Sequence, residues 1–229
     1  ALYTGDEMTQ LLLGITPEWL PTLENFVAGR NAELLTVLRH ALAGKQSERS
    51  LYLWGETGSG KSHLLQAAVS EAQAAGMSAL YAQAAMPPET AQEGVQVVAL
   101  DDVEALDEAA QIALFALYNR LRENGGVLLV SGAAAPAHLQ LRDDLRTRLG
   151  WGLVYQVQAL SDEEKSQALQ QHAQARGLIL PPEVTQYLLR HGRRDLPSLL
   201  AVLDELDAHC LRLKRAPSVP LLKEVMQAG

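Results

Sequence analysis

The sequence predicts an α/β fold: a parallel β-sheet covered by helices, followed by a small all-helical domain. Apolar, strand-like runs alternate with helical patterns as far as about residue 159. Such alternation is typical of a parallel sheet with helices on both faces. Beyond Ser161 only helical patterns remain. A glycine-rich turn between the first strand and the next helix supports the same fold, because phosphate-binding loops occupy this position.

Four strands are expected before the helical part. A helical period over residues 31–44 leads into the first strand, LYLWG, and a helix over residues 61–76 leads into a second strand near SALYAQA. The third strand, VQVVAL, is followed by a helix that reaches about Asn124. Gly125 and Gly126 then introduce the fourth strand, VLLVS.

The C-terminal part is expected to consist of short helices. Ser161 and Glu164 form a capping-box pattern at its start. The single cysteine, Cys210, has Leu211 and Leu213 as neighbours in a helical pattern, which favours a buried position over a reactive thiol. Breaks between helices are expected at residues 177–182, 192–197 and 216–220.

We therefore divide the chain into three parts: a tail (1–16), an α/β domain (17–159) and a helical lid (160–229). Residues 1–7 precede Met8 and are left out of the fold prediction, because a start at Met8 would leave them as a tag.

Composition excludes several classes of protein. The 229 residues carry a net charge of -8, and 48% are hydrophobic, which is enough for a substantial core. No apolar run approaches membrane-spanning length and no signal peptide opens the chain, so we expect a cytoplasmic protein without membrane contact. The acidic balance argues against a general nucleic-acid binder, and the six histidines lack metal-binding spacing.

The turn after the first strand has the spacing of a phosphate loop, G-x-x-x-x-G-K-[ST]. Its glycines let backbone N–H groups point inward, Lys61 would reach the β- and γ-phosphates, and the Ser62 hydroxyl would bind Mg²⁺. The alternative is a glycine-rich surface turn beside an exposed lysine. The nucleotide-binding residues expected in this segment are Gly55, Glu56, Thr57, Gly58, Ser59, Gly60, Lys61, Ser62 and His63.

Two acids end the third strand. Ligands bind at the carboxyl edge of a parallel sheet, so Asp101 is expected to hold Mg²⁺ and Asp102 to polarise an attacking water. A solvated turn after a buried strand is the alternative.

In order along the chain, FVAGRN, GETGSGKSH, ALDDVE, FALYNRL, RTRLGWG and RRDL resemble the AAA+ domain of the DnaA replication initiators. The resemblance extends over about residues 10–229. Within this family, the sequence is most similar to the Hda-type regulatory inactivators of DnaA. This resemblance implies an AAA+ P-loop NTPase with a helical lid that binds ADP or ATP with Mg²⁺. The initiators' helix-turn-helix and self-association domains are not expected here.

The resemblance also implies roles for single residues. Phe26, Val27 and Asn31 would lie on the adenine side, Arg148 would be an arginine finger, and Arg194 would be the sensor 2 arginine near the phosphates. The alternatives are ordinary core positions for Phe26 and Val27 and solvated charges for both arginines.

The tail segment QLLLGI, residues 10–15, resembles the short peptide with which such inactivators bind the sliding clamp. A glutamine amide and aliphatic side chains can fill a polar pocket and an apolar groove. Packing of the tail on its own core is the alternative, and Gly14 stands where a bulkier residue is expected. The predicted clamp-binding residues are Gln10, Leu11, Leu13 and Ile15.

The fourth strand departs from the initiator pattern. It ends at Ser131 and Gly132, where initiators carry a serine followed by an acid. Gly132 cannot orient a water, so we expect slow or absent hydrolysis by the chain itself.

The resemblance predicts a clamp-tethered regulator that supplies Arg148 to the ATP site of DnaA. It is not expected to bind a specific DNA sequence directly. A homo-oligomer is one of the states that the sequence allows. Two alternatives remain: a self-assembling ATPase that remodels or loads a replication protein, and an interaction module with a vestigial site.

Overall fold

The computed structural model describes residues 21–84 and 94–228. Their centre is a five-stranded sheet in the order β2-β3-β4-β1-β5, in which every neighbouring pair is parallel. The predicted α/β fold with a parallel sheet is confirmed. The strands are β1 (Ser50–Trp54), β2 (Ala79–Gln83), β3 (Val97–Asp101), β4 (Val127–Gly132) and β5 (Leu153–Gln156).

The fifth strand was not expected from the sequence. It has four residues, and its burial alternates between half-buried and exposed because it lies at the sheet edge beside β1. The chain reaches it through Gly152, where a Cβ atom would lie 2.3 Å from the carbonyl oxygen of Ser50. Only glycine permits this close approach of the two backbones.

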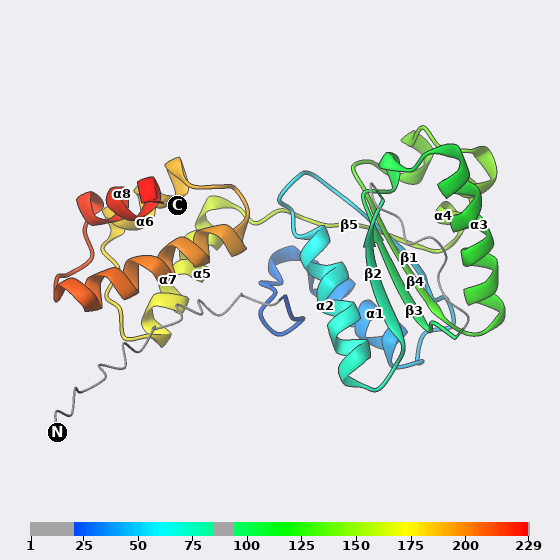
Figure 1. Cartoon of the computed structure of the whole chain (residues 1–229), viewed down its shortest axis with the longest axis horizontal. Helices are drawn as coiled ribbons and strands as arrows, with labels where there is room; N and C mark the ends of the chain where they lie inside the picture. The colour runs from blue at the N-terminus through cyan, green and yellow to red at the C-terminus, as the bar shows by residue number, and fades with distance from the viewer. Residues whose placement is uncertain (1–20, 85–93, 229) are drawn as a thin grey trace, which may run out of the picture.

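Helices cover both faces of the sheet (Figure 1). One face packs against α1 (Ala32–Leu42) and α2 (Lys61–Ala74), and the other against α3 (Glu108–Glu123) and α4 (Asp143–Trp151). The inner strands β3 and β4 are buried along their whole length, as expected for a sheet covered on both sides. Short 3-10 turns occupy Gly29–Asn31, Val103–Ala105 and Pro136–His138.

The last four helices form a separate core beside the sheet (Figure 1). They are α5 (Asp162–Ala175), α6 (Pro182–His191), α7 (Leu196–Leu213) and α8 (Val219–Ala228). The Ser161 hydroxyl accepts the Glu164 N–H at 3.1 Å, so the predicted N-cap of α5 is present. Cys210 is buried on α7, as predicted.

Candidate functional site

A pocket of about 460 Å³ lies where the phosphate loop, the segment before α1 and the lid meet. The part of its wall formed by Gln158, Leu160 and Lys165 belongs to no motif found in the sequence, whereas Asp195 lies within the RRDL segment. The sequence-predicted residues on the wall are Phe26, Val27, Asn31, Thr57, Gly58, Ser59, Gly60, Lys61, Ser62, His63 and Asp102. The pocket thus brings together most of the nucleotide-binding residues expected from the sequence, whereas Gly55 and Glu56 of the same loop are absent from the described wall.

The phosphate loop owes its shape to glycine at two positions. Gly58 and Gly60 have φ values of +81° and +105°, a region that side chains with a Cβ rarely adopt. At Gly60 a Cβ atom would also lie 2.7 Å from Cε2 of Phe26. The loop therefore closes tightly against the segment before α1, and α2 begins at the next residue, Lys61.

Lys61 is folded onto its own loop. Its ammonium group donates hydrogen bonds to the carbonyl oxygens of Gly55 (2.7 Å) and Glu56 (2.9 Å). Burial lowers the pKa of Lys61, and the nearby acids, Asp102 first among them, oppose this shift. An anion in the pocket would add charge-assisted partners for this ammonium group.

Two further polar side chains stand beside the lysine. The Ser59 hydroxyl is buried and has no hydrogen-bond partner among the described residues. His63 is also buried, and its Nε2 lies 2.9 Å from the Thr22 carbonyl oxygen. Burial lowers the pKa of His63. An unpartnered hydroxyl and a helix N-terminus next to a lysine fit the oxygens of a phosphate chain.

The two acids after β3 face different surroundings. Asp101 is only 1% exposed, and its carboxylate accepts hydrogen bonds from the Tyr81 hydroxyl (2.8 Å) and from the Ser131 hydroxyl. Asp102, with φ of +58°, lies on the pocket wall instead. Its backbone N–H donates to the Ser131 oxygen at 2.9 Å, which holds this left-handed turn in place.

The electrostatic environment of Asp102 is crowded with acids. Burial raises the pKa of Asp102, Asp101 and Glu104 raise it further, and Lys61 opposes them. A divalent cation in the pocket would relieve this repulsion, and carboxylate and hydroxyl oxygens are ligands that Mg²⁺ prefers. Asp102 and Ser62 both lie on the wall and carry such oxygens, as do Thr57, Ser59 and Asp195.

At Gly132 there is no space for a side chain. A Cβ atom there would lie 2.0 Å from the Tyr52 hydroxyl oxygen and 3.2 Å from Oε2 of Glu104. The Tyr52 hydroxyl is itself fixed, because it donates to the carbonyl oxygen of Ala134 at 2.7 Å. At position 132, the space that the initiators' acidic side chain would need is therefore filled by Tyr52 of the neighbouring strand β1.

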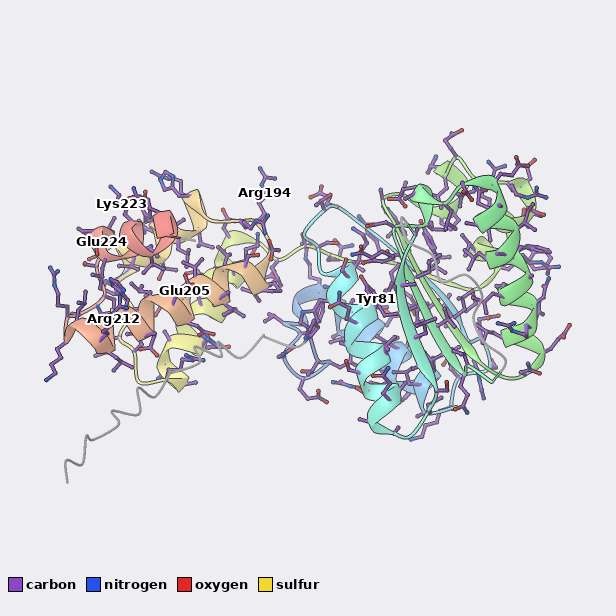
Figure 2. The ribbon with its side chains drawn as sticks, in the orientation of Figure 1. Tyr81, Arg194, Glu205, Arg212, Lys223 and Glu224 are labelled. Carbon is purple, nitrogen blue, oxygen red and sulfur yellow. The ribbon has the colours of Figure 1, made fainter. Side chains whose placement is uncertain are left out.

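Arg194 lies beside the phosphate loop but turns away from it. Its Cβ atom is 3.9 Å from the position that a Cβ at Gly58 would take. The side chain is exposed, and Figure 2 shows it projecting from the lid into solvent. It is absent from the described pocket wall.

Arg148 lies on α4 and is also absent from the described pocket wall. Its guanidinium carbon sits 4.3 Å from the ring centre of Trp151, and 5.8 Å and 5.9 Å from the rings of Phe115 and Tyr118. No described carboxylate forms an ion pair with it.

Comparisons with known proteins agree with this geometry. The model of the bacterial DnaA ATPase domain matches residues 20–87, and that of the Hda lid domain matches residues 162–226. The chain is a DnaA-related AAA+ protein. Its predicted resemblance to Hda is thereby confirmed.

Solved structures of DnaA share the fold of this DnaA-related protein. The AMPPCP-bound DnaA from Aquifex aeolicus is 26% identical with a TM-score of 0.69, covering 85% of this chain and 66% of its own. Domain III of DnaA from Thermotoga maritima is 20% identical with a TM-score of 0.70, covering 91% of this chain and 96% of its own. A DnaA bound to AMPPCP and single-stranded DNA is 23% identical with a TM-score of 0.67, covering 85% of this chain and 68% of its own.

Two predictions stand apart from this site. The clamp-binding segment, with Gln10, Leu11, Leu13 and Ile15, lies outside the described residues. Among the residues that are described, no helix is both long and apolar enough to cross a bilayer.

Proposed function

We propose that this DnaA-related protein regulates replication initiation by promoting the hydrolysis of ATP bound to DnaA. The observation that carries the proposal is the placement of Arg148. It belongs to a segment that resembles an arginine finger, it stands apart from the chain's own pocket, and no described carboxylate neutralises it. Such a cation is available to the phosphates of another molecule.

The chemistry required of Arg148 is electrostatic. In phosphoryl transfer, negative charge spreads over the equatorial oxygens of the transferred group, and an inserted arginine stabilises that charge. A guanidinium stays protonated and can bind two oxygens at once, whereas lysine offers a more strongly hydrated point charge. The lid, which matches the Hda lid, supports an Hda-like role for the whole chain.

We further propose that the chain's own pocket holds ADP or ATP. Lys61 and the backbone N–H groups of the loop would bind the phosphates, and Phe26, Val27 and Asn31 would face the base. The sequence assigns the metal to Ser62 and Asp101, but the Asp101 carboxylate is buried and accepts hydrogen bonds from Tyr81 and Ser131. We therefore propose that Asp102, which lies on the pocket wall, holds Mg²⁺ together with Ser62. Arg194 lies beside the phosphate loop. The metal would neutralise charge on the phosphate oxygens.

Gly132 supports a regulatory rather than a catalytic use of this nucleotide. Tyr52 and Glu104 fill the space in which a side chain could orient water. A nucleotide that touches both the sheet domain and the lid stabilises whichever arrangement of the two it binds better. We infer that nucleotide binding sets the position of the lid.

A tether to the sliding clamp through residues 10–15 completes the proposal. Gln10→Ala combined with Leu13→Ala should abolish co-elution with the clamp and leave the melting temperature nearly unchanged. Undiminished co-elution of this variant would assign the contact to another surface.

One observation favours a second candidate, a self-assembling ATPase that remodels a replication protein: Lys61 and Asp102 lie together in an intact pocket. The two functions differ in which molecule's ATP is cleaved. The test mixes the protein, preloaded with unlabelled nucleotide, with DnaA carrying γ-labelled ATP and with DNA-bound clamp. Release of labelled phosphate supports the proposal, whereas turnover of ATP by the protein alone supports the second candidate.

A further inference from the structure

Three arginines lie close together at α4, and they are held in two different ways. Arg142 pairs with Asp144 at 3.2 Å and with Glu108 at 3.5 Å, and Arg146 pairs with Asp143. The third is held by aromatic rings alone among the described contacts. The helix thus presents two neutralised arginines and one whose charge is not neutralised.

The ring nearest to Arg148 is that of Trp151, one turn further along the same face of α4. The 4.3 Å separation places the guanidinium against the indole, within the range of a cation–π contact. Phe115 and Tyr118 on α3 contact the same guanidinium from farther away. Trp151 is 60% exposed, so this ring and the cation that it holds share one surface.

Stacking differs from ion pairing in what it leaves free. A carboxylate occupies the N–H groups at the edge of a guanidinium, whereas an aromatic ring contacts its face. Arg148 therefore keeps its edge donors for oxygen ligands while its orientation is restrained. This combination suits an arginine that must meet phosphate oxygens on another molecule.

The main chain next to Trp151 is also restrained. Gly152 passes so close to the Ser50 carbonyl oxygen that a Cβ atom would lie 2.3 Å from it, and β5 begins immediately afterwards. The end of α4 is therefore anchored to the sheet. The main chain that carries the Trp151 indole is thus held close to β1.

We propose that Trp151 is the positioning residue for Arg148, holding the guanidinium by its face so that its edge enters the ATP site of the partner. This inference rests on the proposed function. Trp151 acts through Arg148 and makes no contact of its own with the reacting atoms.

The test compares Trp151→Leu, which keeps an apolar side chain but removes the aromatic ring, with Trp151→Phe, which keeps a ring. Single-turnover hydrolysis of DnaA-bound ATP is measured over a range of protein concentrations. Trp151→Leu should lower the maximal rate by about tenfold with little change in the half-saturating concentration, because a misplaced catalytic group slows the chemical step. Trp151→Phe should recover most of the rate.

A second measurement reports the stacking directly. The Arg148 side-chain protons should show an upfield ring-current shift in NMR spectra of the parent protein, and this shift should shrink in Trp151→Leu. Ile179→Ala, which removes an 86% exposed apolar side chain from the lid, is the matched control and should leave both readouts unchanged.

Two results would overturn the inference. A normal maximal rate in Trp151→Leu rejects the positioning role, and a change confined to the half-saturating concentration makes Trp151 a docking contact instead. Arg148→Ala is measured alongside. If Arg148→Ala stimulates hydrolysis normally, the proposed function itself fails, whereas an inactive Arg148→Ala with a normal Trp151→Leu rejects only this inference.

Discussion

The side-chain amide of Asn31 is paired with both main-chain polar groups of Gln158. Its Nδ2 donates to the Gln158 carbonyl oxygen at 2.9 Å, and its Oδ1 accepts the Gln158 N–H at 2.7 Å. Gln158 lies in the connection between β5 and the lid, and both residues line the pocket. The wall of the candidate nucleotide site and the joint between the two domains are therefore built from the same contact.

This contact predicts the effect of Asn31→Ala. Asn31 is only 3% exposed, so its loss leaves main-chain groups of Gln158 without their partner in a place with little access to water. The expected decrease in unfolding free energy is about 1–3 kcal/mol, measured by urea denaturation. Asn31→Asp keeps the acceptor but sets a buried carboxylate oxygen against the Gln158 carbonyl oxygen, so it should lose at least as much stability as the alanine variant. Equal stability of Asn31→Ala and the parent would show that the pairing contributes nothing.

The phosphate loop predicts a loss of nucleotide affinity in Lys61→Ala. The variant lacks the charge-assisted contact with phosphate oxygens, so ADP and ATP should bind at least about tenfold more weakly. Isothermal titration calorimetry measures the affinity. Lys45→Ala, at an exposed position after α1, is the matched control and should bind like the parent. Parent-like affinity in Lys61→Ala would contradict the proposal that the phosphate loop binds the nucleotide.

The packing at the end of β4 predicts that Gly132→Ala is destabilising. The new methyl group would overlap the Tyr52 hydroxyl, and such overpacking costs about 1–3 kcal/mol. Tyr52→Phe removes the clashing oxygen, so adding Gly132→Ala to that background should cost less than adding it to the parent. A double-mutant cycle in thermal or urea unfolding measures this difference. Strictly additive costs would mean that the two side chains do not compete for the same space.

The sequence was sufficient to predict those elements whose pattern and contacts lie within one short segment. Strands β1, β3 and β4 are buried apolar runs, and the Ser161 cap is a local hydrogen bond, so each was predicted from its own residues. Strand β5 was not predicted, because this edge strand of four residues has no continuous apolar run.

The lid side of the pocket could not be predicted for a different reason. Leu160 and Lys165 line the pocket only because the lid packs beside the phosphate loop, about a hundred positions away in the sequence. No short motif records such a contact. Similarly, Asp101 is buried and Asp102 lies on the pocket wall because the chain makes a left-handed turn at Asp102, which a pair of acids in sequence does not reveal.

Of the rings around Arg148, one is predictable from its spacing in the sequence and two are brought there only by packing. Trp151 follows Arg148 by three positions, a helical spacing that the sequence displays. Phe115 and Tyr118 come from α3, and only the packing of α3 against α4 brings them to the same guanidinium.

The central claim is that Arg148 acts on ATP bound to another molecule, and it is tested most directly by single-turnover hydrolysis of DnaA-bound ATP with Arg148→Ala. The variant should keep its fold, its nucleotide affinity and its clamp binding, because Arg148 is absent from the chain's own described pocket wall. Arg146→Ala, which breaks only a surface ion pair with Asp143, is the control and should stimulate hydrolysis like the parent.

The predicted result is a fall in the stimulated rate of at least about two orders of magnitude for Arg148→Ala, with little recovery in Arg148→Lys, since lysine lacks the planar fork that binds two oxygens. Normal stimulation by Arg148→Ala would contradict the account and reduce Arg148 to a surface charge.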